Sequence, residues 1–318
     1  MQTHITVTDA DDGIRLDRWF KRHQPGFPHA MLEKHLRKGL IRLNGNKAKA
    51  SDRIHAGQQL TFPPITLVTK PKKRRESSPE DKQAIQRWVI YKDKDVIAIN
   101  KPFGLPVQGG SKISKSVDDM LDGLMFDATE RPKLVHRLDR DTSGVLVLAR
   151  TAKAAAQLSR AFSGRDIRKT YWALVNNVPE TFKGMIDYRL MKAVMGEASY
   201  ERVAVDDEDG KYAKTEYKVL DALARKFAFM ELTPLTGRTH QLRVHMQAIG
   251  CPIVGDHKYG GSMKDAEALG VANQLHLHAR RIHIPAMGGR REIDIVAPLP
   301  PHMQQSVKAL GINLPKGK

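Results

Sequence analysis

The sequence predicts an α+β protein with a mixed, largely antiparallel sheet in a large domain that follows a smaller α+β domain. Strand-like runs are many, helical runs are few, and the two do not alternate regularly along the chain. Regular alternation would indicate a parallel sheet, whereas strands in succession indicate hairpins and antiparallel pairing. The length of 318 residues is enough for two domains with their own cores.

The boundary between the domains is predicted from a change in composition. The segment TKPKKRRESSPEDK, residues 69–82, is rich in proline, serine and charge and has no apolar periodicity. Such a composition is typical of a linker. We therefore expect a small domain at 1–68, a linker at 69–84 and a large domain at 85–318.

Two helices and a hairpin are expected in the small domain. The first helix is predicted from i, i+3, i+4 spacing of Leu16, Trp19 and Phe20. The second is expected to open at Pro28 and end at Gly39, with one face made of Met31, Leu32, His35 and Leu36. Asn44-Gly45 predicts a tight hairpin turn.

Basic side chains off the apolar faces of this domain are candidates for binding nucleic-acid phosphates. They are Arg15, Arg18, Arg37 and Lys38. A solvated pair of amphipathic helices is the alternative that the small domain alone leaves open.

Most elements expected in the large domain are strands. They are a hairpin at 87–102, a buried strand at 145–150, strands at 169–178, 214–223 and 227–234, and a final pair within 281–298. Two helices are expected: one capped by Thr151 and running to Phe162, and one at 238–250.

The charge balance points to a polyanionic partner. Lys and Arg number 53 against 35 Asp and Glu, giving a net charge of +18 and a pI near 9.9. RNA, DNA or an anionic membrane surface would suit this surplus, and a solvated basic surface is the alternative.

Other features of the composition narrow the class of protein. The single Cys251 excludes an intrachain disulfide and a zinc site built on cysteines. The acidic start lacks the apolar core of a signal peptide, and no run approaches the length of a membrane span. We expect a cytoplasmic monomer that does not associate with a membrane.

Familiar cofactor motifs are absent. The stretch GCPIVGDH (250–257) has the glycine spacing of a phosphate loop but lacks its Lys-Ser/Thr ending, and no GxGxxG follows a strand. His240 and His245 are five residues apart, one more than a helical metal pair requires. His276 and His278 could share a strand face, but no third ligand has a suitable spacing.

The stretch LVHRLDRDTSGVLVLAR (134–150) concentrates charge directly before a core strand. An Asp before Thr-Ser-Gly often only accepts hydrogen bonds from turn amides, and this account is preferred for Asp141. Asp139 could instead be a nucleophile or a base, kept ionised by a nearby cation. Arg238 and Arg243, in TGRTHQLRVH, could supply that cation from a helix, unless they form a stripe on a basic surface.

Five motifs in order, HRLDRDTSG, NKPFGLPVQGG, RKTYWALV, TGRTHQLRVH and CPIVGDHKYG, resemble the RluA-type family of pseudouridine synthases over residues 85–300. Residues 109–111 and LVHRLDRDTSG are most similar to its C-type bacterial large-subunit (23S) rRNA members, although Gln108 replaces their usual His. The N-terminal GIRLDRWF…LRKGLIRLNG resembles a small S-four-like RNA-binding domain.

The resemblance implies a catalytic domain with a central cleft that isomerises specific uridines in rRNA, or in a large-subunit assembly intermediate, to pseudouridine. No cofactor and no metal would be required. Asp139 would attack the anomeric carbon or remove a sugar proton, and Arg243 would pair with it. Tyr171 would stack on the uracil, and Arg137 would fill the gap that the flipped nucleotide leaves. Arg140 and Arg238 would bind RNA.

Two other classes of function stay open. One is a catalytically inactive RNA-binding factor for ribosome assembly on the same scaffold, against which the intact set of Asp139, Tyr171 and Arg243 speaks. The other is a hydrolase that combines Asp139 with a His, for which no matching pattern exists in the sequence.

Overall fold

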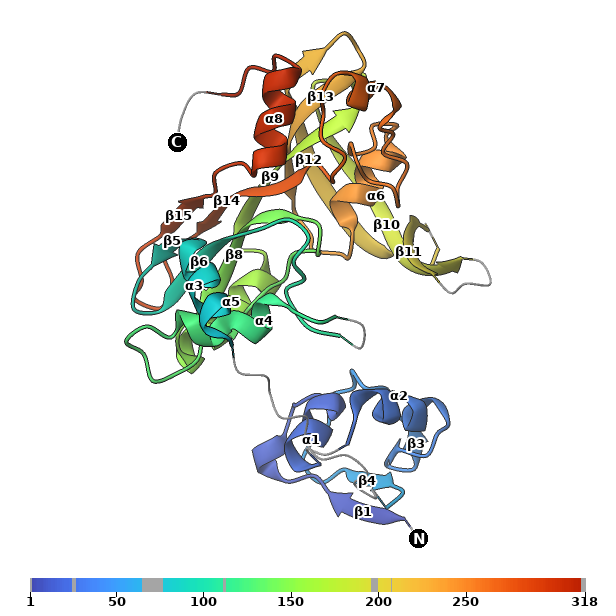
Figure 1. Ribbon diagram of the computed structural model, residues 1–318. Coiled ribbons are helices and arrows are strands. Elements are labelled where there is room, and N and C mark those ends of the chain that lie inside the picture. Colours follow the sequence, from blue (N-terminus) through green and yellow to red (C-terminus); the bar gives the residue numbers. More distant parts are fainter. Residues whose placement is uncertain are drawn as a thin grey trace. The chain divides into compact units, whose positions relative to one another are not determined.

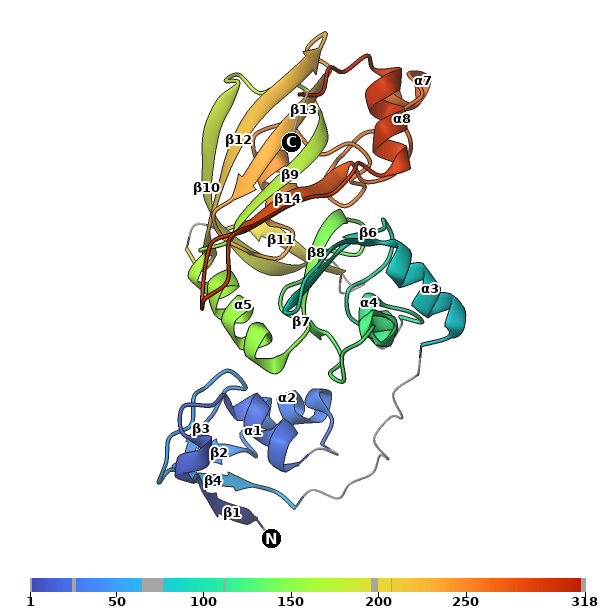
Figure 2. The same cartoon turned by 90° about the vertical axis from the view of Figure 1, so that its left-hand side faces the viewer.

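The computed structural model describes residues 2–24, 27–64, 77–110, 113–195, 200–206 and 208–315. The chain divides into two compact units, Met1–Arg75 and Glu76–Lys318 (Figures 1 and 2). No helix in the described ranges is long and apolar enough to cross a membrane.

Four antiparallel strands and two α-helices make up the described part of the small unit. The sheet has the order β1-β4-β2-β3. Its elements are β1 (Thr3–Thr6), a 3-10 helix (Asp9–Asp11), α1 (Leu16–His23), α2 (His29–Arg37), β2 (Arg42–Leu43), β3 (Asn46–Lys47) and β4 (Gln59–Phe62). Both predicted helices and the hairpin are therefore confirmed.

The core of the small unit lies between its helices and its sheet. Leu16, Trp19 and Phe20 of α1 are almost completely buried there, as their spacing predicts. Met31, which we expected on the apolar face of α2, is 41% exposed, so that prediction is wrong. Leu32 and Leu36, one turn apart, bury that face instead, and Met31 lies outside their stripe.

The large unit is built on a mixed sheet of eleven strands among the described residues. Nine of them follow the order β11-β10-β12-β13-β9-β14-β8-β6-β5, while β15 pairs with β14 and β7 with β8. The strands are β5 (Val89–Lys92), β6 (Val96–Lys101), β7 (Lys133–Leu134), β8 (Ser143–Ala149), β9 (Arg168–Asn176), β10 (Lys183–Met195), β11 (Tyr200–Val205), β12 (Lys211–Leu223), β13 (Phe227–Pro234), β14 (Leu277–Ile284) and β15 (Ile293–Val296).

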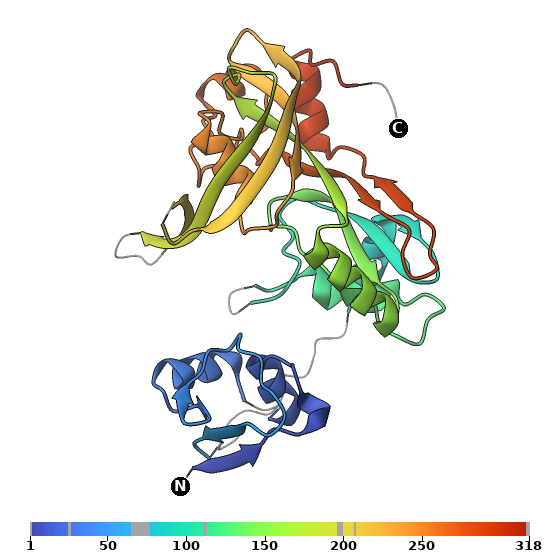
Figure 3. The same ribbon diagram turned by 180° about the vertical axis from the view of Figure 1, so that it is seen from behind.

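Helices cover both faces of this sheet around β8 (Figure 3). Val145 and Val147 of β8 pack in one cluster with Ala154 and Leu158 of α5, while Leu146 packs on the other side with residues of α3, α4 and η2. Burial on both faces explains why β8 reads as a continuous apolar run. The helices are α3 (Pro79–Arg87), α4 (Val117–Met120), η2 (Leu121–Leu124), α5 (Ala152–Gly164), α6 (Gln241–Ala248), α7 (Lys264–Ala268) and α8 (Pro301–Ala309).

The helix α3 corrects the linker that the sequence predicts. Residues 69–76 of that linker lie outside the described residues, but residues 79–84 are helical. The Ser78 side chain accepts a hydrogen bond from the Asp81 amide, Pro79 occupies the first turn, and Ile85 is fully buried. Capping and burial therefore make α3 part of the large unit.

One parallel pairing interrupts the antiparallel sheet, where β14 meets the start of β8. His278 is opposite Ser143, and Ala279 is opposite Gly144. Gly144 has a φ of 109°, and a Cβ there would lie 2.3 Å from the carbonyl oxygen of Ala279. Only glycine allows the two strands to approach so closely. The same residues fix where the segment before β8 enters the sheet.

Two predicted helices differ in extent from the observed ones. The helix capped by Thr151 continues two residues beyond Phe162, and Arg165 takes the left-handed conformation that ends it. The helix predicted at 238–250 is shorter, because His240 at its N-cap is left-handed, with φ 53°. Arg238 therefore lies in the turn before α6. The prediction that it lies on a helix is wrong.

Buried histidines make the large unit sensitive to acid. Burial lowers the pKa of His245, His276 and His278 to about 4, below the unfolded value of about 6.5. Neutral imidazoles therefore stabilise the fold above pH 6.5. As the pH falls towards 4, the contribution of each histidine to the free energy of unfolding decreases by up to about 1.4 kcal/mol per pH unit.

We expect the urea midpoint of the large unit to fall steeply between pH 6.5 and 4. Urea titrations followed by near-ultraviolet circular dichroism at half-unit pH steps measure this. His278→Gln should flatten the slope, and replacement of the exposed His257 by Gln should not. A midpoint that is constant over this pH range would contradict the prediction.

Candidate active site

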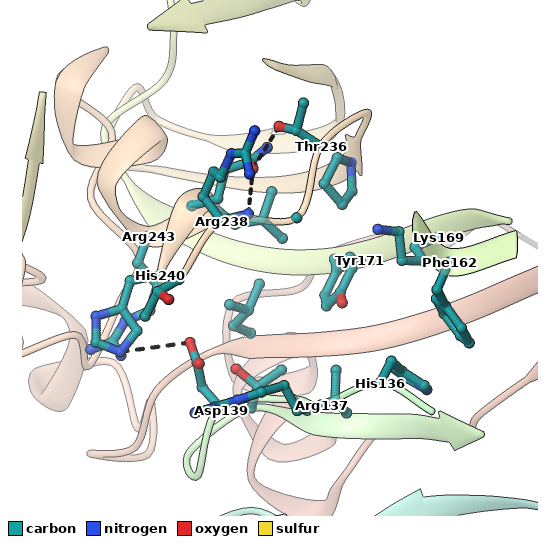
Figure 4. Close-up of a pocket in the computed structure, with 18 residues that line it drawn as sticks. His136, Arg137, Asp139, Phe162, Lys169, Tyr171, Thr236, Arg238, His240 and Arg243 are labelled. Carbon is teal, nitrogen blue, oxygen red and sulfur yellow. Dashed lines mark hydrogen bonds and ion pairs between the residues drawn. The ribbon is translucent and has the colours of Figure 1, made fainter. Parts of the chain in front are cut away.

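A pocket of about 310 Å³ opens where the segment before β8, the strand β9 and the turn before α6 meet (Figure 4). Its wall includes Arg137, Asp139, Tyr171, Arg238 and Arg243, all of which the sequence nominates. The structure thus brings together residues separated by more than one hundred positions along the chain. A pocket of this size suits a group as large as a nucleobase with part of its sugar.

Asp139 has a carboxylate that is free of turn contacts. Its side chain is 25% exposed, and its charged neighbour is His240, whose Nε2 lies 3.9 Å from Oδ2. Thr142 donates to the main-chain oxygen of Asp139, and no amide in the described ranges donates to the carboxylate. The account of Asp139 as a turn-capping residue therefore has no support in the structure.

Arg243 does not pair with Asp139, so the predicted ion pair is wrong. Its Nε and Nη2 donate to the two carboxylate oxygens of Asp256, both at 2.7 Å. Burial alone would lower the pKa of the Arg243 guanidinium, but the hydrogen bonds and charge of Asp256, helped by the charge of Asp139, outweigh this and raise the pKa. Arg243 is thus a buried, fixed cation beside the pocket.

The loop that carries Asp256 depends on two glycines. A Cβ at Gly255 would lie 2.0 Å from the carbonyl oxygen of Gln274, and one at Gly261 would lie 1.9 Å from that of Ile253. Asp256 also accepts from the amide of Tyr259. Gly255, which belongs to the stretch that mimics a phosphate loop in the sequence, therefore allows, together with Gly261, a tight turn around a buried carboxylate.

Gln241 holds the turn that leads into α6. Its side-chain oxygen accepts from the Thr236 hydroxyl at 2.7 Å and from the Arg238 amide at 3.0 Å, while its amide group donates to the Lys214 carbonyl at 2.9 Å. Gln241 is buried with all these bonds made. The sequence offered no signal for this role, because Gln241 stands between His240 and Leu242 in a largely polar stretch.

Tyr171 and Lys169 project from the same face of β9, because they are two residues apart on a strand. Both line the pocket. Burial, helped by the negative charge of Asp139, raises the pKa of the Tyr171 hydroxyl, which therefore stays protonated at neutral pH. Burial lowers the pKa of the Lys169 amine. Lys169 is not among the site residues nominated from the sequence, although it lies in the motif RKTYWALV.

Lys101 is a second residue near the site that the sequence reasoning did not single out. It is completely buried, and its Nζ donates to the carbonyls of Pro102, Leu105 and Arg140 at 2.8–2.9 Å. Burial lowers the pKa of Lys101 to about 7, and the charges of Asp141 and Asp139 oppose this. Lys101 thus ties the segment of Asp139 to the loop after β6.

Three arginines predicted to bind RNA lie at or near the pocket. Arg137 and Arg238 line it and are exposed, and the Nε of Arg238 donates to the Tyr212 carbonyl. Arg140 is exposed and lies 3.6 Å from Asp141. In the small unit, Arg15 pairs with Asp17, whereas Arg18, Arg37 and Lys38 are exposed and have no acidic partner within the described part of the chain.

The geometry defines a class of protein. A free carboxylate faces a pocket surrounded by Arg137, Lys169, Arg238 and Arg243, and this is the arrangement of a carboxylate enzyme with a polyanionic substrate. Within the described ranges, no group of three or more His, Cys, Asp or Glu could hold a metal ion.

Comparisons with known proteins give the family. The family model described as RNA pseudouridylate synthase matches residues 95–248. The ribosomal large subunit pseudouridine synthase C of Rickettsia bellii is 35% identical, covering 95% of this chain and 99% of that protein. The protein of the same name from Vibrio vulnificus is 32% identical over 98% of both chains.

A solved structure is similar as well. Human RNA pseudouridylate synthase domain containing 4 is 31% identical and has a TM-score of 0.63, covering 74% of this chain and 97% of that one. The chain belongs to the RNA pseudouridylate synthase family, and it is an RNA pseudouridine synthase.

Proposed function

We propose that this enzyme converts uridines of large-subunit ribosomal RNA to pseudouridine, with Asp139 as the group that acts on the sugar. The observation that carries the proposal is the partly exposed Asp139 carboxylate, free of turn contacts, in a pocket lined by cations. The names of the two bacterial relatives support the choice of RNA. The net charge of +18 favours such a substrate.

The reaction is an isomerisation that balances without any further reactant. The bond between N1 of the uracil and C1′ of the ribose breaks, the base turns over, and C5 forms a new bond to C1′. C5 loses a proton and N1 gains one, so nothing is oxidised and nothing leaves. The enzyme must therefore hold a detached uracil and move protons, which a closed pocket with fixed polar groups favours.

The pocket residues suit these tasks. Asp139 faces the sugar, and the ring of Tyr171 forms the wall against which the uracil stacks. Arg137, which is exposed at the rim, occupies the place that the flipped nucleotide leaves. Flipping costs a few kcal/mol, and contacts between basic side chains and the RNA backbone offset that cost.

Tritium release tests the proposal directly. Large-subunit rRNA labelled with tritium at C5 of its uracils should release tritium into water when the enzyme is added, because C5 loses its hydrogen. Mapping of pseudouridines in rRNA from cells that lack this protein identifies the sites. Binding of rRNA without tritium release would instead support the catalytically inactive assembly factor.

Lys169 is expected to contact one RNA phosphate. Its amine lines the pocket, and within the described ranges it has no acidic partner. Lys169→Gln should therefore weaken rRNA binding and reduce the slope of log K against log salt concentration by about 0.7. Arg168→Gln is the matched control, because Arg168 is exposed on the opposite face of β9. Equal slopes for Lys169→Gln and wild type would contradict the phosphate contact.

The small unit is proposed to be the S-four-like RNA-binding domain. Its exposed cations Arg18, Arg37 and Lys38, which have no acidic partner among the described residues, support this role. Deletion of residues 1–68 should lower the affinity for rRNA and the salt dependence, since each lost phosphate contact removes about 0.7 from the slope. Filter binding from 50 to 300 mM salt measures both. Unchanged affinity and slope would show that the small unit does not bind the RNA.

A further inference from the structure

His240 contacts the active-site carboxylate, and sequence reasoning considered it only as a metal ligand. Its Nε2 lies 3.9 Å from Oδ2 of Asp139, across the pocket wall (Figure 4). Arg243, three residues further along, faces Asp256 instead. His240 at the N-cap and Arg243 in the first turn of α6 thus lie beside two different carboxylates, and His240 is within 3.9 Å of Asp139.

The backbone of His240 is held in a conformation that favours glycine. Its φ and ψ are 53° and 18°, in the left-handed region, at the N-cap of α6. Such a conformation is strained for a side-chain-bearing residue and persists when its surroundings fix it. The hydrogen bonds of Gln241 to the same turn provide that support.

Tyr259 determines which nitrogen of His240 carries the proton. The Tyr259 hydroxyl lies 2.7 Å from His240 Nδ1 and accepts a hydrogen bond from the Val203 amide at 3.1 Å. Tyr259 is completely buried, so its own proton has His240 Nδ1 as its acceptor. In this assignment the proton of the neutral imidazole is on Nε2, which faces Asp139.

The surroundings keep this imidazole neutral. Burial lowers the pKa of His240, Asp139 raises it, and Arg243 and Lys258 lower it further, with a net decrease. The guanidinium carbons of Arg243 and Arg202 lie 5.0 and 5.2 Å from the centre of the Tyr259 ring. Of these two cations, Arg243 opposes a positive charge on the neighbouring His240.

We propose that His240, with its tautomer fixed by Tyr259, is the positioning residue that orients the Asp139 carboxylate through an Nε2–H donor. The 3.9 Å separation closes to a hydrogen bond when RNA fills the pocket, as happens to loose contacts in unliganded active sites. The inference rests on the proposed function of Asp139, and it adds His240 to Arg243, whose pKa the charge of Asp139 also raises, as a group that acts on this carboxylate.

Replacements that keep one imidazole nitrogen at a time test the proposal. Gln places its amide nitrogen near the position of Nε2, and Asn places a polar group near Nδ1. His240→Gln should retain most of the activity, whereas His240→Asn should lower kcat about 10- to 100-fold with little change in KM. Tyr259→Phe, which keeps the ring beneath Arg243, should lower kcat about tenfold because it frees the tautomer.

A double variant separates positioning from packing. In His240→Asn, the added change Tyr259→Phe should cost no further activity, because the donor to Asp139 is already lost. The exposed His257→Gln is the matched control and should behave as wild type. Urea midpoints identify any variant whose loss of activity comes from unfolding.

Several results would overturn this role for His240. Equal activity of His240→Gln and His240→Asn, additive losses in the double variant, or an increase in KM in place of a decrease in kcat would each do so. Absence of tritium release by the wild-type enzyme would overturn the proposed function itself. That result is distinguishable from a failure of the role proposed for His240, because it is seen with the wild-type enzyme before any variant is compared.

Discussion

Asp139→Asn should reduce kcat for tritium release from rRNA by about 10²- to 10⁴-fold. The amide has the shape of the carboxylate but cannot attack the anomeric carbon or take a proton from the sugar. Stability should change by less than about 1 kcal/mol, because the side chain is partly exposed and accepts no hydrogen bond from described main-chain amides. RNA binding should therefore persist while chemistry stops.

Asp141→Asn is the control for this substitution. Asp141 lies two residues away, is paired with Arg140 at 3.6 Å and does not line the pocket. Its loss should leave tritium release close to that of wild type. Single-turnover tritium release and filter binding, measured on the same preparations, separate chemistry from affinity. Release by Asp139→Asn at the wild-type rate would refute the assignment of Asp139.

Asp256→Asn should destabilise the large unit by about 3–5 kcal/mol, because it leaves the buried Arg243 guanidinium without its counter-charge. It should also lower activity, since Asp256 accepts hydrogen bonds from Arg243, which lines the pocket, and from the amide of Tyr259. Urea unfolding monitored by near-ultraviolet circular dichroism measures the first effect, and tritium release measures the second.

Two comparisons sharpen this second prediction. Asp294→Asn removes an exposed partner of Arg281 and should cost no more than about 1 kcal/mol. The double variant Arg243→Met/Asp256→Leu should be more stable than either loss of a single partner, because no buried charge stays unpaired. An effect of Asp256→Asn below 1 kcal/mol would show that water replaces the carboxylate.

The elements of the large unit were predictable where local signals are strong. The apolar run of β8, the strand β13 and the cap of α5 at Thr151 follow from alternation, burial and capping rules. The start of α3 carries an equally local signal, a Ser-Pro pair followed by acidic residues. The charge and proline content around it suggested a linker, and that outweighed the capping signal.

Pairings between distant segments could not be predicted. The parallel contact of β14 with β8 joins Ser143 to His278, and no periodicity encodes a register across such a separation. The predicted partner of Arg243 is wrong for the same reason. Asp139 and Asp256 are both carboxylates near basic motifs, and the turn at Gly255, which only the folded chain reveals, decides between them.

The order of the strands has a consequence for the synthesis of the enzyme. Asp139 precedes β8, Tyr171 lies in β9, and β14, which is translated after both, separates these two strands in the sheet. While a ribosome is still translating the segment before Leu277–Ile284, the gap between β8 and β9 has no occupant. A nascent chain of that length cannot assemble the pocket, so an rRNA-modifying activity appears only when translation of the large unit is nearly complete.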